Sequence, residues 1–159
     1  MRATLTPGRT DQDDLAIRDR QLCRWDAQAL HVKYGNGKVF DGNLALGPAL
    51  VTPEEIENPM DLPIRCWVDE ELRQDSTTRE YIWGIAEVIE YYSSMITLEP
   101  GFLICPGTPG GCAVGSDPDC GGQSKHVAPG SQYLRPDQTV VVEIGSVGRI
   151  AHRVREPAK

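Results

Sequence analysis

The alternation of apolar and polar residues is clearest near the C-terminus. Residues 139–144 read Thr-Val-Val-Val-Glu-Ile, and a second such run, residues 149–154, follows a glycine-containing turn at residues 145–148. β-branched runs joined by a glycine turn are typical of a hairpin. Residues 64–68 alternate in the same way, and the acidic pair at 69–70 predicts a tight turn into a return strand. The pattern therefore predicts two hairpins.

A different period predicts the main helix, which we expect to begin after residues 76–78. Apolar side chains recur there every three or four positions, with charged residues on the other face. They are Tyr81, Ile82, Ile85, Ala86, Val88, Ile89 and Tyr92. A shorter helix is expected to start at residues 52–55, where threonine, proline and a glutamate at the third helical position form a capping-box pattern. Asn58-Pro59 should end it within two turns.

The remaining segments are less regular. Residues 44–51 are apolar but broken by Gly47-Pro48, which predicts a buried, kinked strand. Residues 103–105 predict a short strand after a turn at 99–101. The charged stretch 11–28 is interpreted as a strand end that passes into a short helix. Residues 106–132 have no period, and a loop of that length is typically functional or disordered. The whole pattern predicts a β-rich α+β domain.

Length and composition restrict the classes of protein to consider. A chain of 159 residues is long enough for one ordinary domain, which we place at residues 11–159 after a disordered tail at residues 1–10. The formal net charge of −7 disfavours nucleic acid and anionic membranes as partners. No apolar run approaches 18 residues, so no membrane span is predicted.

The N-terminus and the cysteines point to the cytoplasm. The first ten residues have a positive start but lack the apolar segment of a secretory signal. The five cysteines are an odd number without a C-x-x-C pair, which argues against a disulfide framework and a zinc knuckle. We therefore expect reduced thiols in a cytoplasmic protein.

Three groups of residues could carry chemistry. Asp13 and Asp14 offer carboxylate oxygens to a hard cation, and Arg18 offers a two-pronged donor to a substrate carboxylate, with Gln21 close behind. Taken alone, acids near a turn are more often simply solvated. Lys38, which follows a glycine, could project an ammonium group into a pocket, although a solvated lysine on a surface hairpin is the commoner case.

The third group is the glycine-rich stretch 106–111, which contains Gly107 and Thr108. Glycines allow a close approach of backbone N–H groups to a ligand, and a threonine hydroxyl can donate to an oxyanion. For an isolated match, an ordinary turn is the more common explanation. The three histidines have no partner at ligand spacing, and no serine lies in a G-x-S-x-G elbow.

Five stretches, in chain order, resemble motifs of the fumarylacetoacetate hydrolase family. They are Asp14-Leu-Ala-Ile-Arg18-Asp19-Arg-Gln21; Gly37-Lys38-Val39-Phe40-Asp41 with Leu46-Gly47-Pro48; Glu71-Leu72-Arg73-Gln74-Asp75-Ser76-Thr77-Thr78; Leu98-Glu99-Pro100-Gly101 with Gly107-Thr108-Pro109; and Tyr133-Leu134-Arg135-Pro136-Asp137 with Val142-Glu143-Ile144 and Val147-Gly148. Together they extend over residues 13–154, nearly the whole chain.

The resemblance implies a β-rich roll or sandwich of the family's C-terminal type, with one main helix and usually a homodimer. It also implies Mg²⁺ or Mn²⁺ that chelates a small 2-oxo or β-diketo acid and stabilises the enolate formed when a C–C bond breaks. By motif, Asp14 would be a metal ligand and Lys38 would offset charge beside the metal. Arg18 would orient the substrate carboxylate, and substrate would also contact Gln21 and the Gly107–Thr108 stretch.

Three alternatives stay open beside a metal-dependent hydrolase or lyase. The chain could be a decarboxylase of the same family, or a tautomerase or isomerase. It could also be a non-catalytic binding or dimerisation domain, because the family's E-x-E metal ligands have no counterpart among the thirteen residues before Asp14. We therefore expect the chain to correspond to the C-terminal part of the family's catalytic domain.

Overall fold

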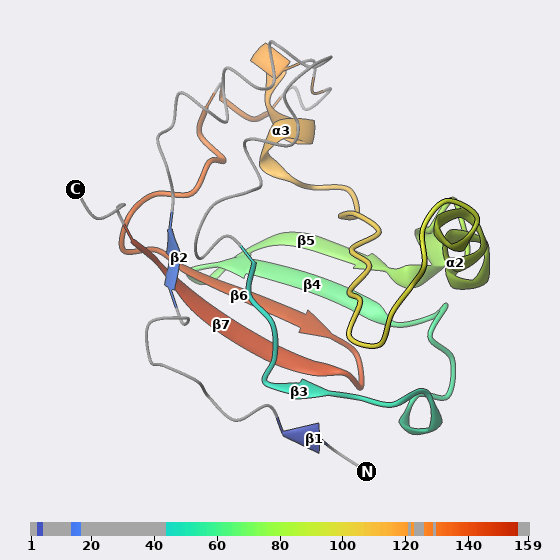
Figure 1. The fold of residues 1–159 in the computed structure, drawn as a ribbon. Helices are drawn as coiled ribbons and strands as arrows, with labels where there is room; N and C mark the ends of the chain where they lie inside the picture. Colours follow the sequence, from blue (N-terminus) through green and yellow to red (C-terminus); the bar gives the residue numbers. More distant parts are fainter. Residues whose placement is uncertain are drawn as a thin grey trace.

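A five-stranded sheet dominates the structure (Figure 1). The computed structural model describes residues 3–4, 14–16, 44–120, 122, 126–128 and 130–155. In spatial order the strands are β2 (Asp14–Ala16), β7 (Gly148–Arg155), β6 (Thr139–Ile144), β4 (Pro63–Val68) and β5 (Glu71–Thr77). β2 runs parallel to β7, and the other neighbours are antiparallel. The sheet and the one main helix confirm the predicted β-rich α+β class.

Both predicted hairpins are confirmed, and backbone hydrogen bonds link them. At the β4–β5 turn Asp69 adopts a left-handed φ of 56°, and its carboxylate accepts a hydrogen bond of 2.9 Å from the backbone N–H of Thr139. At the β6–β7 turn the Gly145 N–H donates to the carbonyl of Pro63 at 2.9 Å. Each turn is thus tied to the neighbouring hairpin, which fixes the register of β4 against β6.

Valines supply the buried apolar residues of the described part. Val68, Val140, Val141 and Val154 are each less than a tenth exposed, and Val154 is fully buried. They lie on the three adjacent strands β4, β6 and β7, where a β-branched side chain packs well against cross-strand neighbours.

The main helix is confirmed but starts later than predicted. α2 spans Ile85–Ser93, and a separate 3₁₀ turn, Thr78–Glu80, precedes it. The backbone turns extended at Tyr81, so Tyr81 and Ile82 lie outside the helix. Gly84 occupies the N-cap position, where its N–H donates to the Glu87 carboxylate at 2.7 Å. This capping interaction sets the start of α2.

Two predicted elements before β4 are wrong in detail. Residues 44–51 do not form a buried strand, because only Ala49–Leu50 (β3) is extended in a ladder and Leu44, Leu46 and Leu50 are each more than half exposed. β3 pairs with β1 (Ala3–Thr4) in a separate two-stranded sheet.

The short helix predicted at residues 52–55 is a single 3₁₀ turn, Pro53–Glu55. The Thr52 side chain makes no capping hydrogen bond to the backbone, and the chain turns extended at Ile56. Hydrogen bonds from its own backbone N–H and from Thr52 lower the pKa of Glu54. The capping hydrogen bond predicted for Thr52 is therefore not formed in this turn.

After α2 the chain is largely irregular. The predicted turn at residues 99–101 is present, closed by a hydrogen bond of 3.1 Å from the N–H of Phe102 to the carbonyl of Glu99. The strand predicted at residues 103–105 is wrong, since this segment joins no ladder among the described residues. Farther on, the long loop contains α3 (Ala113–Ser116) and a 3₁₀ turn, Pro118–Cys120.

Two points complete the comparison with the sequence. The helix expected within residues 17–28 falls outside the described residues, and the domain limits at residues 10 and 11 stay a prediction. No described helix has the length and apolar character needed to cross a membrane.

Candidate functional site

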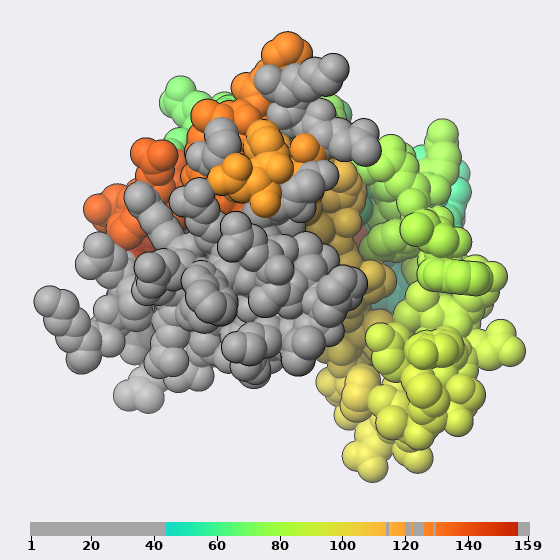
Figure 2. Space-filling model, turned by 90° about the horizontal axis from the view of Figure 1, so that it is seen from above, coloured from blue at the N-terminus to red at the C-terminus, as the bar shows by residue number. Residues whose placement is uncertain are grey.

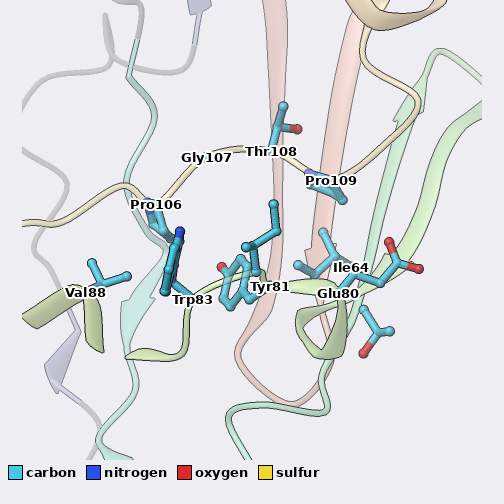
Figure 3. Close-up of a pocket in the computed structure, with 11 residues that line it drawn as sticks. Ile64, Glu80, Tyr81, Trp83, Val88, Pro106, Gly107, Thr108 and Pro109 are labelled. Carbon is cyan, nitrogen blue, oxygen red and sulfur yellow. The ribbon is translucent and has the colours of Figure 1, made fainter. Parts of the chain in front are cut away.

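A pocket of about 230 Å³ lies between the segment that leads into α2 and the glycine-rich loop (Figure 3). One wall is the loop Pro106–Pro109, and the opposite wall carries Tyr81, Trp83 and Val88. The other lining residues are Ile64, Thr77, Glu80 and Ile82. Its lining is mostly apolar with a few polar groups, which is the usual character of a small-molecule site.

The glycine-rich loop is fastened to the edge strand β5 by the side chain of Gln74. The amide nitrogen lies 3.0 Å from Thr108 Oγ1, 3.0 Å from the carbonyl oxygen of Pro109 and 3.2 Å from that of Gly110. Because carbonyl oxygens only accept hydrogen bonds, the NH₂ group of Gln74 must face the loop. The NH₂ group of this one side chain therefore holds residues 108–110 beside β5.

This contact also determines what Thr108 can do. Its oxygen accepts a hydrogen bond from Gln74, so its own O–H is left to donate elsewhere. Thr108 belongs to the loop that lines the pocket, but its side chain points away from Tyr81 and Trp83 on the opposite wall (Figure 3).

A glycine is required where the loop turns back from β5. A Cβ at Gly111 would lie 2.6 Å from the backbone oxygen of Arg73, and the residue has a φ of +89°. Both the close approach and the left-handed conformation exclude a side chain. The loop can therefore lie against β5 only with glycine at this position.

Two further interactions organise the long loop. Arg73, next to Gln74 in β5, donates to the side chain of Gln132 and forms an ion pair of 2.9 Å with Glu71. Asp117 is 1% exposed, and its carboxylate accepts hydrogen bonds of 3.0 Å from the backbone N–H groups of Asp119 and Gly130. Through these hydrogen bonds the buried carboxylate holds Asp119 and Gly130 close together within the long loop.

The charges near the pocket are unevenly distributed. Among the described residues that line the pocket, Glu80 alone is charged, and Ser76 donates to its carboxylate at 2.8 Å. In β4, burial raises the pKa of the Cys66 thiol, and the nearby Arg73 guanidinium opposes that shift. Cys66, Cys105 and Cys112 are free thiols in the structure.

Of the predicted site residues, the structure brings together Gly107 and Thr108 in the pocket wall. Arg18, Gln21 and Lys38 lie outside the described residues. The backbone of Asp14 begins β2, opposite Arg153 of β7. β2 and β5 are the two edges of the sheet, so the described residues do not by themselves place Asp14 beside Thr108.

A metal site is likewise not assembled by the described residues alone. Within them no three His, Cys, Asp or Glu side chains gather closely enough to hold an ion. The described residues by themselves therefore do not form a complete divalent-cation site.

Three residues that organise this region had no role in the sequence-based prediction. They are Arg73, Gln74 and Asp117. The Arg-Gln pair stands within one of the five motif stretches, which could have marked it. Asp117 had no such signal, because a buried carboxylate cannot be distinguished from a solvated one by sequence.

Comparison with known proteins gives consistent results. The profile of the family described as "Fumarylacetoacetate (FAA) hydrolase C-terminal" matches residues 10–155. The chain is 35% identical to the mitochondrial oxaloacetate tautomerase FAHD2B of Bos taurus, over 92% of this chain and 41% of that protein. It is also 35% identical to a bifunctional isomerase/decarboxylase of 4-hydroxyphenylacetate degradation from Salmonella dublin, over 92% of this chain and 28% of the relative.

A solved structure shows the same fold. The maleylpyruvate hydrolase of Sphingobium sp. SYK-6, in complex with manganese(II) and pyruvate, superposes with a TM-score of 0.62 at 27% identity. The match covers 77% of this chain and 39% of the hydrolase. This chain thus spans less than half the length of the relatives it matches.

Proposed function

The chain belongs to the fumarylacetoacetate hydrolase family. We propose that it forms all or part of an enzyme that cleaves a C–C bond in a small 2-oxo or β-diketo acid. In such a hydrolysis water adds to the acyl carbonyl, the C–C bond breaks and a pyruvate-type enolate leaves. The maleylpyruvate hydrolase with bound pyruvate supports this reaction class.

One observation carries the proposal. The Gly107–Thr108 stretch, which the motif assigns to the substrate, lines the pocket, and Gln74 holds this stretch beside β5. Negative charge develops on a substrate oxygen when an enolate forms, and hydrogen-bond donors on this stretch would stabilise it more than they stabilise the neutral substrate.

The residues that the motifs assign complete the proposed site. Asp14 would ligate Mg²⁺ or Mn²⁺, and Lys38 would offset charge nearby. Arg18 and Gln21 would bind the substrate. The manganese(II) in the maleylpyruvate hydrolase supports a divalent cation in this family.

The proposal extends to the whole protein. Like the family in general, it would form a homodimer and act without nucleic acid or membrane. The free thiols of the described cysteines are compatible with the cytoplasm, which we propose as its location.

A second candidate is tautomerisation or isomerisation of a 2-oxo acid, with decarboxylation as a variant. The names of two relatives at 35% identity support it, an oxaloacetate tautomerase and a bifunctional isomerase/decarboxylase. The two candidates share the enolate and differ in what reaches the substrate, which is water in a hydrolysis and a proton in a tautomerisation.

Parallel assays separate the candidates. The 159-residue chain is incubated with Mn²⁺ and either acetylpyruvate, with pyruvate release as the readout, or oxaloacetate, with enol–keto conversion followed by ultraviolet absorbance. We expect pyruvate release, lost in Lys38→Ala and lowered in Thr108→Val. Conversion of oxaloacetate alone would favour the second candidate, and inactivity on both would contradict the proposed function.

A further inference from the structure

The pocket beside the glycine-rich loop offers hydrocarbon surface that the protein leaves uncovered. Its lining includes the aromatic side chains of Tyr81 and Trp83 and the aliphatic side chains of Ile82 and Val88, with Pro106 on the opposite wall. Trp83 is 66% exposed and Ile82 is 88% exposed. Binding is favoured when an apolar part of a ligand removes such surface from water.

The charge in this lining is negative. None of the described residues that line the pocket is a lysine, arginine or histidine, and Glu80 supplies a carboxylate. Figure 3 shows Glu80 well apart from Val88 and Trp83. A carboxylate on the bound molecule would therefore meet hydrocarbon at one end of the pocket and a like charge at the other. Both are unfavourable, because a carboxylate that leaves water needs a cationic or N–H partner.

Within the substrate class proposed above, the acyl side of the molecule can end in a second carboxylate or in an uncharged hydrocarbon group. We propose that this pocket receives the acyl side of the substrate, and that the substrate is a 2-oxo acid whose acyl group is uncharged and apolar. This inference rests on the proposed function. The carboxylate of such a substrate stays at its 2-oxo end, to which the motif assigns Arg18.

The pocket adjoins the stretch that the motif assigns to the substrate, and it has room for such a group. Gly107 and Thr108 belong to one wall, and Pro106 precedes them in the same wall. A molecule held at Gly107–Thr108 therefore has the apolar lining within reach. An apolar cavity of about 150 Å³ is large enough to bind benzene. At about 230 Å³ this pocket can take a phenyl ring or a short branched alkyl chain.

The test compares two acylpyruvates of nearly equal size and shape. Succinylpyruvate ends in a carboxylate, and isocaproylpyruvate carries an isopropyl group in its place. Pyruvate release in the presence of Mn²⁺ gives kcat/KM for both. We expect the value for isocaproylpyruvate to be at least about tenfold higher, because only the carboxylate loses its hydration without gaining a partner. An equal or higher value for succinylpyruvate would overturn the inference.

Trp83→Ala tests whether the apolar wall holds the acyl group. We expect kcat/KM for isocaproylpyruvate to fall by about tenfold, because the indole ring no longer covers the alkyl chain. Acetylpyruvate has a much shorter acyl group, so its kcat/KM should fall by less than about twofold. Equal losses on the two substrates would overturn the inference.

Phe102→Ala is the matched control for Trp83→Ala. Phe102 is also a large exposed aromatic residue of this region, at 56%, but it does not line the pocket. Its replacement should leave kcat/KM for both substrates within about twofold of the unaltered chain. Thermal melts of all variants check folding. Losses on isocaproylpyruvate that are equal in Trp83→Ala and Phe102→Ala would overturn the inference.

The contribution of charge is tested at Glu80. Glu80→Gln removes the negative charge at nearly constant shape, and Glu80→Lys reverses it. We expect the preference for isocaproylpyruvate over succinylpyruvate to shrink by about two- to fivefold in Glu80→Gln and further in Glu80→Lys. The change should weaken at high salt, because Glu80 is exposed. Glu90→Gln, an exposed residue of α2 outside the pocket lining, is the control and should leave the preference unaltered. An unchanged preference in both Glu80 variants would overturn the inference.

Failure of the inference and of the proposed function give different results. An unaltered chain that releases pyruvate but prefers succinylpyruvate overturns the inference alone. Conversion of oxaloacetate without release of pyruvate from any acylpyruvate also overturns the inference, because oxaloacetate carries a second carboxylate, and it favours the second candidate function. A chain that converts none of these compounds overturns the proposed function, and the inference fails with it.

Discussion

The two hairpins and the segment around α2 differ in how far their apolar side chains are buried. In the sheet, the valines of β4, β6 and β7 are buried by neighbouring strands. In the segment from Ile82 to Leu103, large apolar side chains remain exposed, and no residue of α2 itself is buried. They are Ile82, Trp83, Ile85, Ile89, Tyr91, Tyr92, Met95, Ile96, Phe102 and Leu103. Figure 2 shows this green-to-yellow segment as a lobe beside the gold residues of the glycine-rich loop.

The difference shows that an amphipathic sequence pattern can produce a helix without determining whether its apolar side chains are buried. The period of α2 is that of an amphipathic helix, and a capping interaction starts it, so the helix forms where its sequence favours it. Within the described part of the chain, its apolar face nevertheless makes few contacts with the strands. The sheet, by contrast, satisfies its backbone and buries its valines with its own strands. We therefore expect the sheet to carry most of the chain's stability.

The largest test of this contrast compares Val154→Ala with Ile82→Ala. Val154 is fully buried, and loss of two methyl groups together with the cavity left behind should lower the free energy of unfolding by about 2–3 kcal/mol. Ile82 is 88% exposed, and its replacement should change that free energy by less than about 0.5 kcal/mol. Urea denaturation measures both. Equal losses would mean that the segment before α2 is packed as firmly as the sheet.

A second test asks whether the loop belongs to the rigid region. Gly111→Ala places a Cβ against the Arg73 backbone at a positive φ and should cost about 1–3 kcal/mol, with loss of turnover as the loop leaves Gln74. Gly110 has nothing within 4 Å of its Cβ position, so Gly110→Ala is the control and should be nearly silent. If the two variants behaved alike in melting and activity, the close fit of loop and strand would be refuted.

The smallest effect concerns two thiols. Cys66 is half-buried within β4, whereas Cys105 is exposed beyond α2. Burial raises the pKa of Cys66, so its thiol stays protonated to higher pH and should react with iodoacetamide at least about tenfold more slowly than Cys105 at pH 8. Mass spectrometry of the labelled peptides measures both rates. Faster labelling of Cys66 would place it outside a packed sheet.

The same shift has a consequence for stability. Folding raises the Cys66 pKa, so its contribution to stability is complete below the ordinary thiol pKa and is lost as pH rises through the folded-state pKa. Cys66→Ala should therefore show a shallower loss of stability above pH 9 than the unaltered chain. An identical pH dependence would contradict this assignment.

The sequence predicted best those parts of the fold whose signals lie within a few neighbouring residues. The hairpins were predicted because alternation and turn residues are short-range features, as at residues 64–77 and 139–154. The burial assigned to Leu44 and Leu46 was wrong, because apolar character does not say which neighbour, if any, covers a side chain. The start of α2 was misplaced because the apolar period already begins at Tyr81, whereas the Gly84–Glu87 pair determines where the helix begins.

The site was predictable only in part for a similar reason. Motif order located Gly107 and Thr108, which the structure places in the pocket wall. The role of Gln74 could not be read from sequence, because its partners are more than thirty residues away and the contact depends on how the loop folds back on β5. The roles of Asp14, Arg18, Gln21 and Lys38 stay predictions.

The most direct test of the account is calorimetric titration of Mn²⁺ into the 159-residue chain, beside an Asp14→Asn variant of equal thermal stability. Under the proposed function, Asp14 would be one ligand of a divalent cation. We therefore expect saturable Mn²⁺ binding that is lost or weakened at least about tenfold in Asp14→Asn, since one carboxylate ligand is removed. Absence of binding, or equal binding by both proteins, would contradict it.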